Sequence, residues 1–137
     1  NPLAMLSSSP LTAGVTLLIV LLMFDTCFAV GKGRHRYGVK APSVTGHPTF
    51  ERLYRVQMNT LEWTAMCLPC LWICAAYVSD GVAAGLGAVW LVGRVWYAIG
   101  YAKEPALRAR GFTLAALAFG ALGLAAGGGV LWRLLGA

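Results

Sequence analysis

The chain has 137 residues, of which 58% are hydrophobic, and it carries a formal net charge of +6. Charged residues make up only 12% of the chain, about half the share that soluble domains usually have. This composition argues against a soluble globular protein and favours an integral membrane protein. The length allows one domain, which we expect to cover residues 1–137.

Four apolar runs follow one another along the chain, Leu11–Val30, Trp63–Val78, Gly81–Ala102 and Gly111–Trp132. We expect the membrane-spanning helices built around them to cover about residues 11–31, 51–78, 81–102 and 106–133. A membrane-spanning helix needs about 20 mostly apolar residues, and none of the runs alternates in polarity as barrel strands do. We therefore predict an all-α integral membrane protein, built as a four-helix up-down bundle. A cleaved signal peptide is the weaker interpretation of the first run, because basic residues follow that run and none precedes it.

The basic residues predict the orientation in the membrane. Six of the 11 Lys and Arg lie between the first and second runs, and three lie between the third and fourth. By the positive-inside rule, both basic loops face the cytoplasm and both termini lie outside. We expect a bacterial inner membrane with the active site on the cytoplasmic side. Since topology accounts for the positive charge, we expect no nucleic-acid partner.

Two pairs of glycines have the spacing of helix-packing motifs. They are GxxxG pairs, Gly81 with Gly85 and Gly123 with Gly127. Such spacing lets helix backbones approach closely in lipid, so it predicts the packing faces of the third and fourth helices.

A polar stretch, ERLYRVQMNTLE from Glu51 to Glu62, leads into the second run. If the helix extends back to about Glu51, then Arg55, Asn59 and Glu62 lie at i, i+4 and i+7 on one face. Charges inside a span are costly unless they face protein, water or a ligand. Two interpretations remain open at this point: an internal ion pair between Arg55 and Glu62, or a binding surface.

The third run carries a second polar face. GRVWYAIGY places Arg94, Tyr97 and Tyr101 at i, i+3 and i+7. An interfacial belt of aromatic residues would explain the tyrosines but not the deeper arginine. Pro105 should end or reset the helix, which places Arg108 in the loop or in the first turn of the fourth helix.

A ligand complementary to these groups is small and anionic and carries an amino group. Glutathione fits this description, with two carboxylates, one ammonium, two amides and a thiol. A thiol has a pKa near 8.5, and a nearby guanidinium favours its charged form. Lowering that pKa by about two units requires roughly 2.7 kcal/mol, which one well-placed arginine can supply in a partly desolvated site.

The segments FERLYRVQMNTLE, LPCLW, GRVWYAIGY and KEPALRARG resemble the MAPEG family, the membrane-associated proteins in eicosanoid and glutathione metabolism. Within that family, the chain is most similar to bacterial microsomal-type glutathione transferases. The resemblance runs from about Arg34 to Arg110. It implies a homotrimer of four-helix subunits, in which glutathione binds between neighbours at the cytoplasmic side. We expect no metal, because His35 and His47 lie in a loop far from the cysteines.

The resemblance also assigns glutathione-binding roles to five polar residues. Arg55, Asn59 and Glu62 would hold the γ-glutamyl end of glutathione. Gln57 and Arg34 would help to hold the glycyl end.

Three more residues receive roles by resemblance, and two positions depart from the family pattern. Tyr97 and Tyr101 would close the pocket, and Arg108 stands where the family places its thiolate-stabilising arginine. Trp63 replaces a tyrosine found in family enzymes, so one hydroxyl contact is lost. His35 replaces a second catalytic arginine. The resemblance therefore supports thiolate formation better than it supports eicosanoid chemistry.

The remaining reactive residues point to no further chemistry. Cys67 and Cys70 form a C-x-x-C pair inside a span, where cysteine commonly behaves as a small buried hydrophobe. We expect neither a redox function nor a metal site there. Asp25 is a charge within the first run, and it either pairs with Arg94 or lines a polar interface.

The leading hypothesis is a membrane enzyme of detoxification that activates glutathione as a thiolate. The thiolate would add to a lipophilic electrophile reached through the membrane lipid, and reduction of lipid hydroperoxides is a second expected activity. The alternative is a non-enzymatic lipid-binding or scaffold protein of the same family. Arg55 and Arg108 favour the enzyme. A small transporter using Asp25 and Arg94 is a third, weaker hypothesis.

Overall fold

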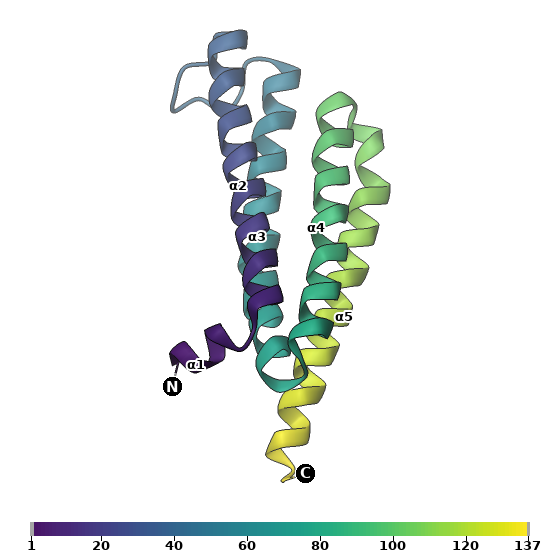
Figure 1. Cartoon of the computed structure of the whole chain (residues 1–137). Coiled ribbons are helices and arrows are strands. Elements are labelled where there is room, and N and C mark those ends of the chain that lie inside the picture. Colours follow the sequence, from purple (N-terminus) through teal and green to yellow (C-terminus); the bar gives the residue numbers. More distant parts are fainter. Residues whose placement is uncertain (1, 137) are drawn as a thin grey trace.

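The computed structural model describes residues 2–136, apart from the side chains of Pro2 and Met5. The described part is helical and contains no strand, so the all-α prediction is confirmed. Four long helices run up and down beside one another (Figure 1). They are α2 (Pro10–Tyr37), α3 (Pro48–Tyr77), α4 (Asp80–Lys103) and α5 (Ala109–Leu134), with a short α1 (Pro2–Ser7) before them and a 3-10 turn η1 (Pro105–Arg108) between α4 and α5.

Proline and local capping groups set the helix boundaries. Helix α2 ends where Gly38 takes a left-handed conformation, with φ of 68°, and its N–H donates to the Arg34 carbonyl. Helix α3 begins with Pro48 at its first position, where the missing N–H costs nothing. The His47 side chain caps it by accepting from the Thr49 N–H at 3.1 Å. Helix α3 therefore includes the whole polar stretch that precedes the second apolar run.

A long-range cap ties the start of α2 to the start of α4. The two carboxylate oxygens of Asp80 accept from the Thr12 N–H at 2.8 Å and from the Leu11 N–H at 3.0 Å. These are first-turn amides with no acceptor inside their own helix. A carboxylate at this position also interacts favourably with the helix dipole. One residue earlier, Ser79 caps α4 by accepting from the Val82 N–H at 3.0 Å.

Apolar side chains fill the interior and also cover much of the outside. Ile19, Leu71 and Leu122 are fully buried, whereas Leu117 and Leu124 are 69% and 80% exposed. A soluble protein rarely exposes apolar area on this scale, and an outer surface of this kind is compatible with lipid.

Three of the four long helices are long and apolar enough to cross a membrane: residues Pro10–Tyr37, Asp80–Lys103 and Pro105–Leu134. Helix α3 has 30 residues, but it is not among the three. The reason is that its N-terminal half consists largely of the polar stretch from Glu51 to Glu62.

The closest contacts between helices are made by Gly93 and Gly111, and not by the glycines of the predicted GxxxG pairs. A Cβ added at Gly93 would lie 2.6 Å from the backbone nitrogen of Ala115, and one at Gly111 would collide with the backbone of Tyr97. Helices α4 and α5 therefore touch backbone to backbone. The prediction for the GxxxG pairs is wrong within this chain, because no described atom lies within 4 Å of a Cβ added at Gly81, Gly85, Gly123 or Gly127.

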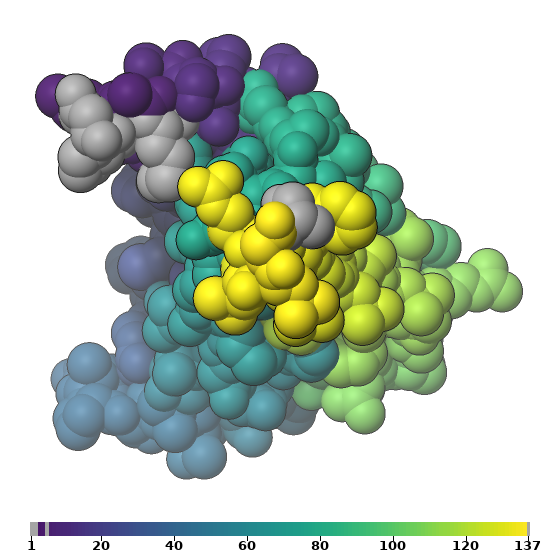
Figure 2. Space-filling view, turned by 90° about the horizontal axis from the view of Figure 1, so that it is seen from below, coloured from purple at the N-terminus to yellow at the C-terminus, as the bar shows by residue number. Residues whose placement is uncertain are grey.

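The two ends of the bundle differ in what they carry. The loop of residues 38–47 and η1 lie at one end, which we call the basic end (Figure 1). At the opposite end lie α1 and the last turns of α5, seen in purple and yellow in Figure 2. The basic segments that flank the apolar runs thus gather at a single end of the molecule.

Candidate functional site

A cavity of about 360 Å³ opens at the basic end between α3, α4, η1 and α5. We call it the basic cavity. It is lined by Arg55, Asn59, Tyr97, Tyr101, Arg108, Ala109, Phe112 and Thr113. Five of the eight site residues expected from the sequence therefore face one space, although they come from three separate segments of the chain.

Helical spacing and one chain reversal place these five residues. Arg55 and Asn59 are one turn apart on α3, and Tyr97 and Tyr101 are one turn apart on α4. Glu104 is extended, with φ of −158° and ψ of 135°, and Pro105 then starts η1. This reversal brings the Arg108 guanidinium back to 5.5 Å from the centre of the Tyr101 ring.

The two phenol rings form the wall of the cavity on the α4 side. The Tyr97 and Tyr101 rings meet edge to face, with centroids 5.5 Å apart. Tyr97 also lies against Phe112 of α5, at 6.2 Å. Tyr97 is buried and Tyr101 is half-buried, so aromatic packing fixes the position of both hydroxyl groups.

Arg94 lies behind this wall and is only 1% exposed. Its Nη2 donates to Asn59 Oδ1 at 2.9 Å and to Thr60 Oγ1 at 2.8 Å. Its guanidinium also stacks on the Tyr97 ring, 4.1 Å from the ring centre. The proposed pairing of Arg94 with Asp25 is therefore wrong, because the guanidinium faces α3 instead.

Arg55 and Glu62 form an ion pair at 3.6 Å, with side chains 55% and 57% exposed. A pair this exposed contributes little to stability. Of the two alternatives that the sequence left open, the ion pair is present, although it is exposed and not internal; the binding surface stays a prediction. Arg55 lines the basic cavity, whereas Glu62, its partner in the ion pair, does not.

Arg34 and Gln57 lie away from the basic cavity. Arg34 Nη1 donates to the Ser43 carbonyl at 2.7 Å, and the guanidinium lies 5.0 Å from the centre of the Phe50 ring. These contacts anchor the loop of residues 38–47 to α2. Gln57 is half-buried on α3, two residues after Arg55 and so on a different face of the helix. Neither residue lines the cavity within this chain.

Sequence reasoning missed the contribution of α5. Phe112 and Thr113 complete the cavity wall, and the available signal was their position one turn after Arg108. Trp63 packs edge-on against Phe112 and Phe119, with ring centroids 5.4 Å apart in both pairs. Trp63 thus supports the cavity wall through aromatic packing.

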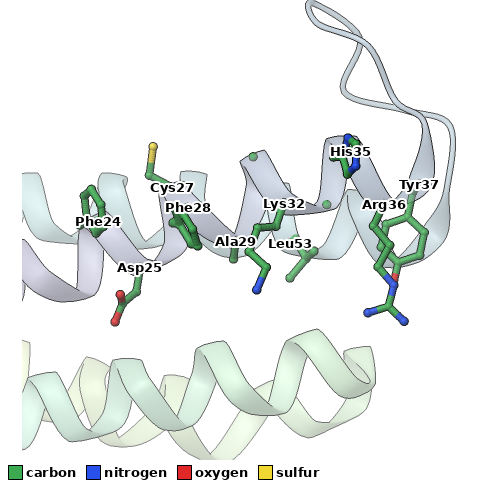
Figure 3. Close-up of a pocket in the computed structure, with 12 residues that line it drawn as sticks. Phe24, Asp25, Cys27, Phe28, Ala29, Lys32, His35, Arg36, Tyr37 and Leu53 are labelled. Atoms are coloured by element: carbon green, nitrogen blue, oxygen red, sulfur yellow. The ribbon is translucent and has the colours of Figure 1, made fainter.

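A second, larger groove of about 1040 Å³ runs along the basic half of α2. Asp25, Lys32 and Arg36 point to one side of the helix, and Cys27 and His35 point to the other (Figure 3). Asp25 is exposed and forms no hydrogen bond or ion pair with the residues that the structure describes. The groove is lined mainly by apolar atoms and lacks the convergent donors of the basic cavity.

The cysteines are not linked to one another. Cys67 and Cys74 are fully buried in the core, and all four cysteines are free thiols. Between residues 2 and 136, no three His, Cys, Asp or Glu side chains gather where they could hold a metal ion.

The sequence of this chain matches the family model of MAPEG over residues 12–128. The chain belongs to the MAPEG family. Together with three membrane-length apolar helices, this membership identifies an integral membrane protein and confirms the resemblance found in the sequence.

Three relatives show how the similarity extends within MAPEG. An uncharacterized protein of Synechocystis is 44% identical over 124 residues, which cover 90% of this chain and 88% of that protein. Leukotriene C4 synthase of Cavia porcellus is 42% identical over 72% of this chain and 65% of its own length. Human microsomal glutathione S-transferase 2 is 37% identical over 80% of this chain and 75% of its own length.

Proposed function

We propose that this MAPEG protein is a membrane-bound glutathione transferase. It activates glutathione as a thiolate and adds it to lipophilic electrophiles. Two of its relatives carry the names of a glutathione S-transferase and of leukotriene C4 synthase, which supports an enzyme that uses glutathione as co-substrate. The observation that carries the proposal is the joint presence of Arg55 and Arg108 in the basic cavity beside two phenols.

The chemistry of the cavity supports a thiolate. A guanidinium has five donors and no acceptor, and it stays protonated at any working pH. Two such groups around 360 Å³ favour the charged form of a bound thiol over the neutral form. The phenol hydroxyls of Tyr97 and Tyr101 can donate to the same sulfur. Arg108 is the proposed catalytic residue because it reaches the cavity from a separate segment, next to Tyr101.

The carboxylates of glutathione need further cations. Arg55, Asn59 and Glu62 form the proposed γ-glutamyl site. Arg34 and Gln57 are the proposed glycyl contacts, and their distance from the cavity is accounted for if a neighbouring subunit supplies them. We therefore propose a homotrimer in which each glutathione lies between two subunits.

The second substrate is proposed to arrive through the bilayer. Apolar side chains cover the outside of the bundle next to the basic end, so a lipophilic electrophile can approach without leaving lipid. Reduction of lipid hydroperoxides is a second proposed activity, and detoxification is the proposed role. The positive-inside rule supports a cytoplasmic basic end with both termini outside, in a bacterial inner membrane.

A non-enzymatic lipid-binding or scaffold protein is the alternative. The open apolar groove along α2 favours it, because such a groove can hold a lipid without any chemistry. A scaffold has no need for two arginines that converge on a small polar cavity, and this convergence is why we prefer the enzyme.

A glutathione titration on detergent-purified protein tests the proposal. Binding is followed by calorimetry, and thiolate formation is followed by its ultraviolet absorbance. S-methylglutathione is the matched control ligand, since it should bind without a thiolate signal. Turnover is then measured with a chromogenic lipophilic electrophile and with a lipid hydroperoxide. Glutathione binding without thiolate or turnover would favour the scaffold. A lack of glutathione binding would reject both the transferase activity and the reduction of hydroperoxides.

A further inference from the structure

Arg94 is a buried charge without a counterion. It is 1% exposed, and no carboxylate pairs with it in the part of the chain that the structure describes. Its Nη2 has two neutral acceptors, whereas its Nε has no hydrogen-bond partner among those residues. Placing a cation in such a position is costly, so a function is needed to explain it.

The contact with Asn59 determines which way that amide points. Oxygen and nitrogen of an asparagine amide are hard to tell apart by shape alone. Arginine has only donors, however, so the amide atom 2.9 Å from Arg94 Nη2 must be the acceptor oxygen. The amide nitrogen then points away from Arg94. Because Asn59 lines the basic cavity, the group left for a ligand is the donor.

We propose that Arg94 is a positioning residue for anion recognition in the basic cavity. It locks the Asn59 amide with its N–H groups available to the ligand. Asn59, Arg55 and Arg108 then all present hydrogen-bond donors to the cavity. The cavity therefore favours a ligand group that is anionic and rich in acceptors. The ligand class is a carboxylate or thiolate of a small peptide, and its identity as glutathione rests on the function proposed above.

Removing Arg94 should weaken binding for a defined reason. Without the guanidinium, Asn59 Oδ1 loses its buried donor and turns toward water in the cavity. Binding an anion then requires the amide to turn back and leave its oxygen unpaired. An unsatisfied buried acceptor of this kind weakens binding by roughly tenfold or more. Arg94 itself touches no ligand, since it does not line the cavity.

A purely structural role makes a different prediction. Arg94 also joins α4 to α3 through Thr60, which is fully buried and does not line the cavity. If that link were its only purpose, losing Thr60 would weaken binding as much as losing Arg94 does. Thr60→Val is therefore the matched control. It removes one acceptor of the same nitrogen and leaves the bond to Asn59 in place.

The experiment is a double-mutant cycle on the full-length protein, with calorimetric binding of glutathione and the thiolate absorbance of the complex as readouts. The variants are Arg94→Met, which keeps the side-chain stem, Asn59→Ala, and the pair combined. Arg94→Lys is added as a variant that retains a donor and the charge. Each variant is compared only after size-exclusion chromatography shows the wild-type assembly.

We expect Arg94→Met and Asn59→Ala each to raise the Kd for glutathione roughly tenfold. The combined variant should equal Asn59→Ala within about twofold, because the two residues act through one contact. Thr60→Val should stay within about twofold of wild type, and Arg94→Lys should recover part of the affinity. Additive losses, or an unchanged Kd in Arg94→Met, would overturn the positioning role. If wild type itself fails to bind glutathione, the proposed function fails, and the positioning role falls with it.

Discussion

Replacing Arg108 by alanine should remove the group that most favours the thiolate. Arg108 is exposed and shares the basic cavity with Arg55, so its field acts through a partly solvated medium. Two unit charges about 4 Å apart interact by about 1 kcal/mol in water and about 4 kcal/mol at an effective dielectric constant near 20. Lowering a thiol pKa by two units needs about 2.7 kcal/mol, which lies inside this range.

The pH dependence follows from that shift. If wild type holds the bound thiol at a pKa near 6.5, about three quarters of it is thiolate at pH 7. In Arg108→Ala the pKa returns toward 8.5, and only about 3% remains thiolate, a loss of roughly 25-fold. At a pH below the wild-type pKa, the loss of thiolate approaches a hundredfold. Above pH 9 the loss disappears, because the thiol then ionises unaided.

The assay is the pH–rate profile of conjugation, together with a thiolate absorbance titration of the glutathione complex. Binding should weaken less than turnover, because other groups hold the carboxylates. Arg110→Ala is the control, since Arg110 is also an exposed cation, lies two residues away and does not line the basic cavity. A wild-type profile in a correctly assembled Arg108→Ala protein would refute the catalytic role and leave Arg108 as a lipid-headgroup contact.

Three further outcomes are expected. Arg55→Ala should raise the Michaelis constant for glutathione more than it lowers turnover, because its contact is equally strong in ground and transition states; an unchanged Michaelis constant would contradict the assignment. Asp80→Ala should lower the melting temperature by a few degrees through loss of its cap on α2, whereas Glu104→Ala should leave it unchanged, and equal melting of the two variants would argue against the cap. A reporter active only in the cytoplasm should be silent when fused to the C-terminus, and a strong signal there would reverse the topology.

The sequence by itself determined the helical class and the positions of the main helices. Long apolar runs leave few alternatives once a membrane is the solvent, because every backbone polar group must find its partner within the helix. The break between α4 and the helical turn that begins at Pro105 also follows from local chemistry, because proline fixes its own φ and lacks an N–H. The motif around Arg55 and Asn59 sufficed to recognise the MAPEG family.

Only the tertiary structure decided which polar faces meet. Periodicity shows that Arg94 and Tyr97 share a face of α4, but not how that face is rotated against its neighbours. The bundle turns Arg94 toward Asn59 on α3 and away from Asp25 on α2. In the same way, Gly93 and Gly111 carry the backbone contact between α4 and α5, because packing of whole helix surfaces sets the rotation, and spacing within one helix cannot reveal it.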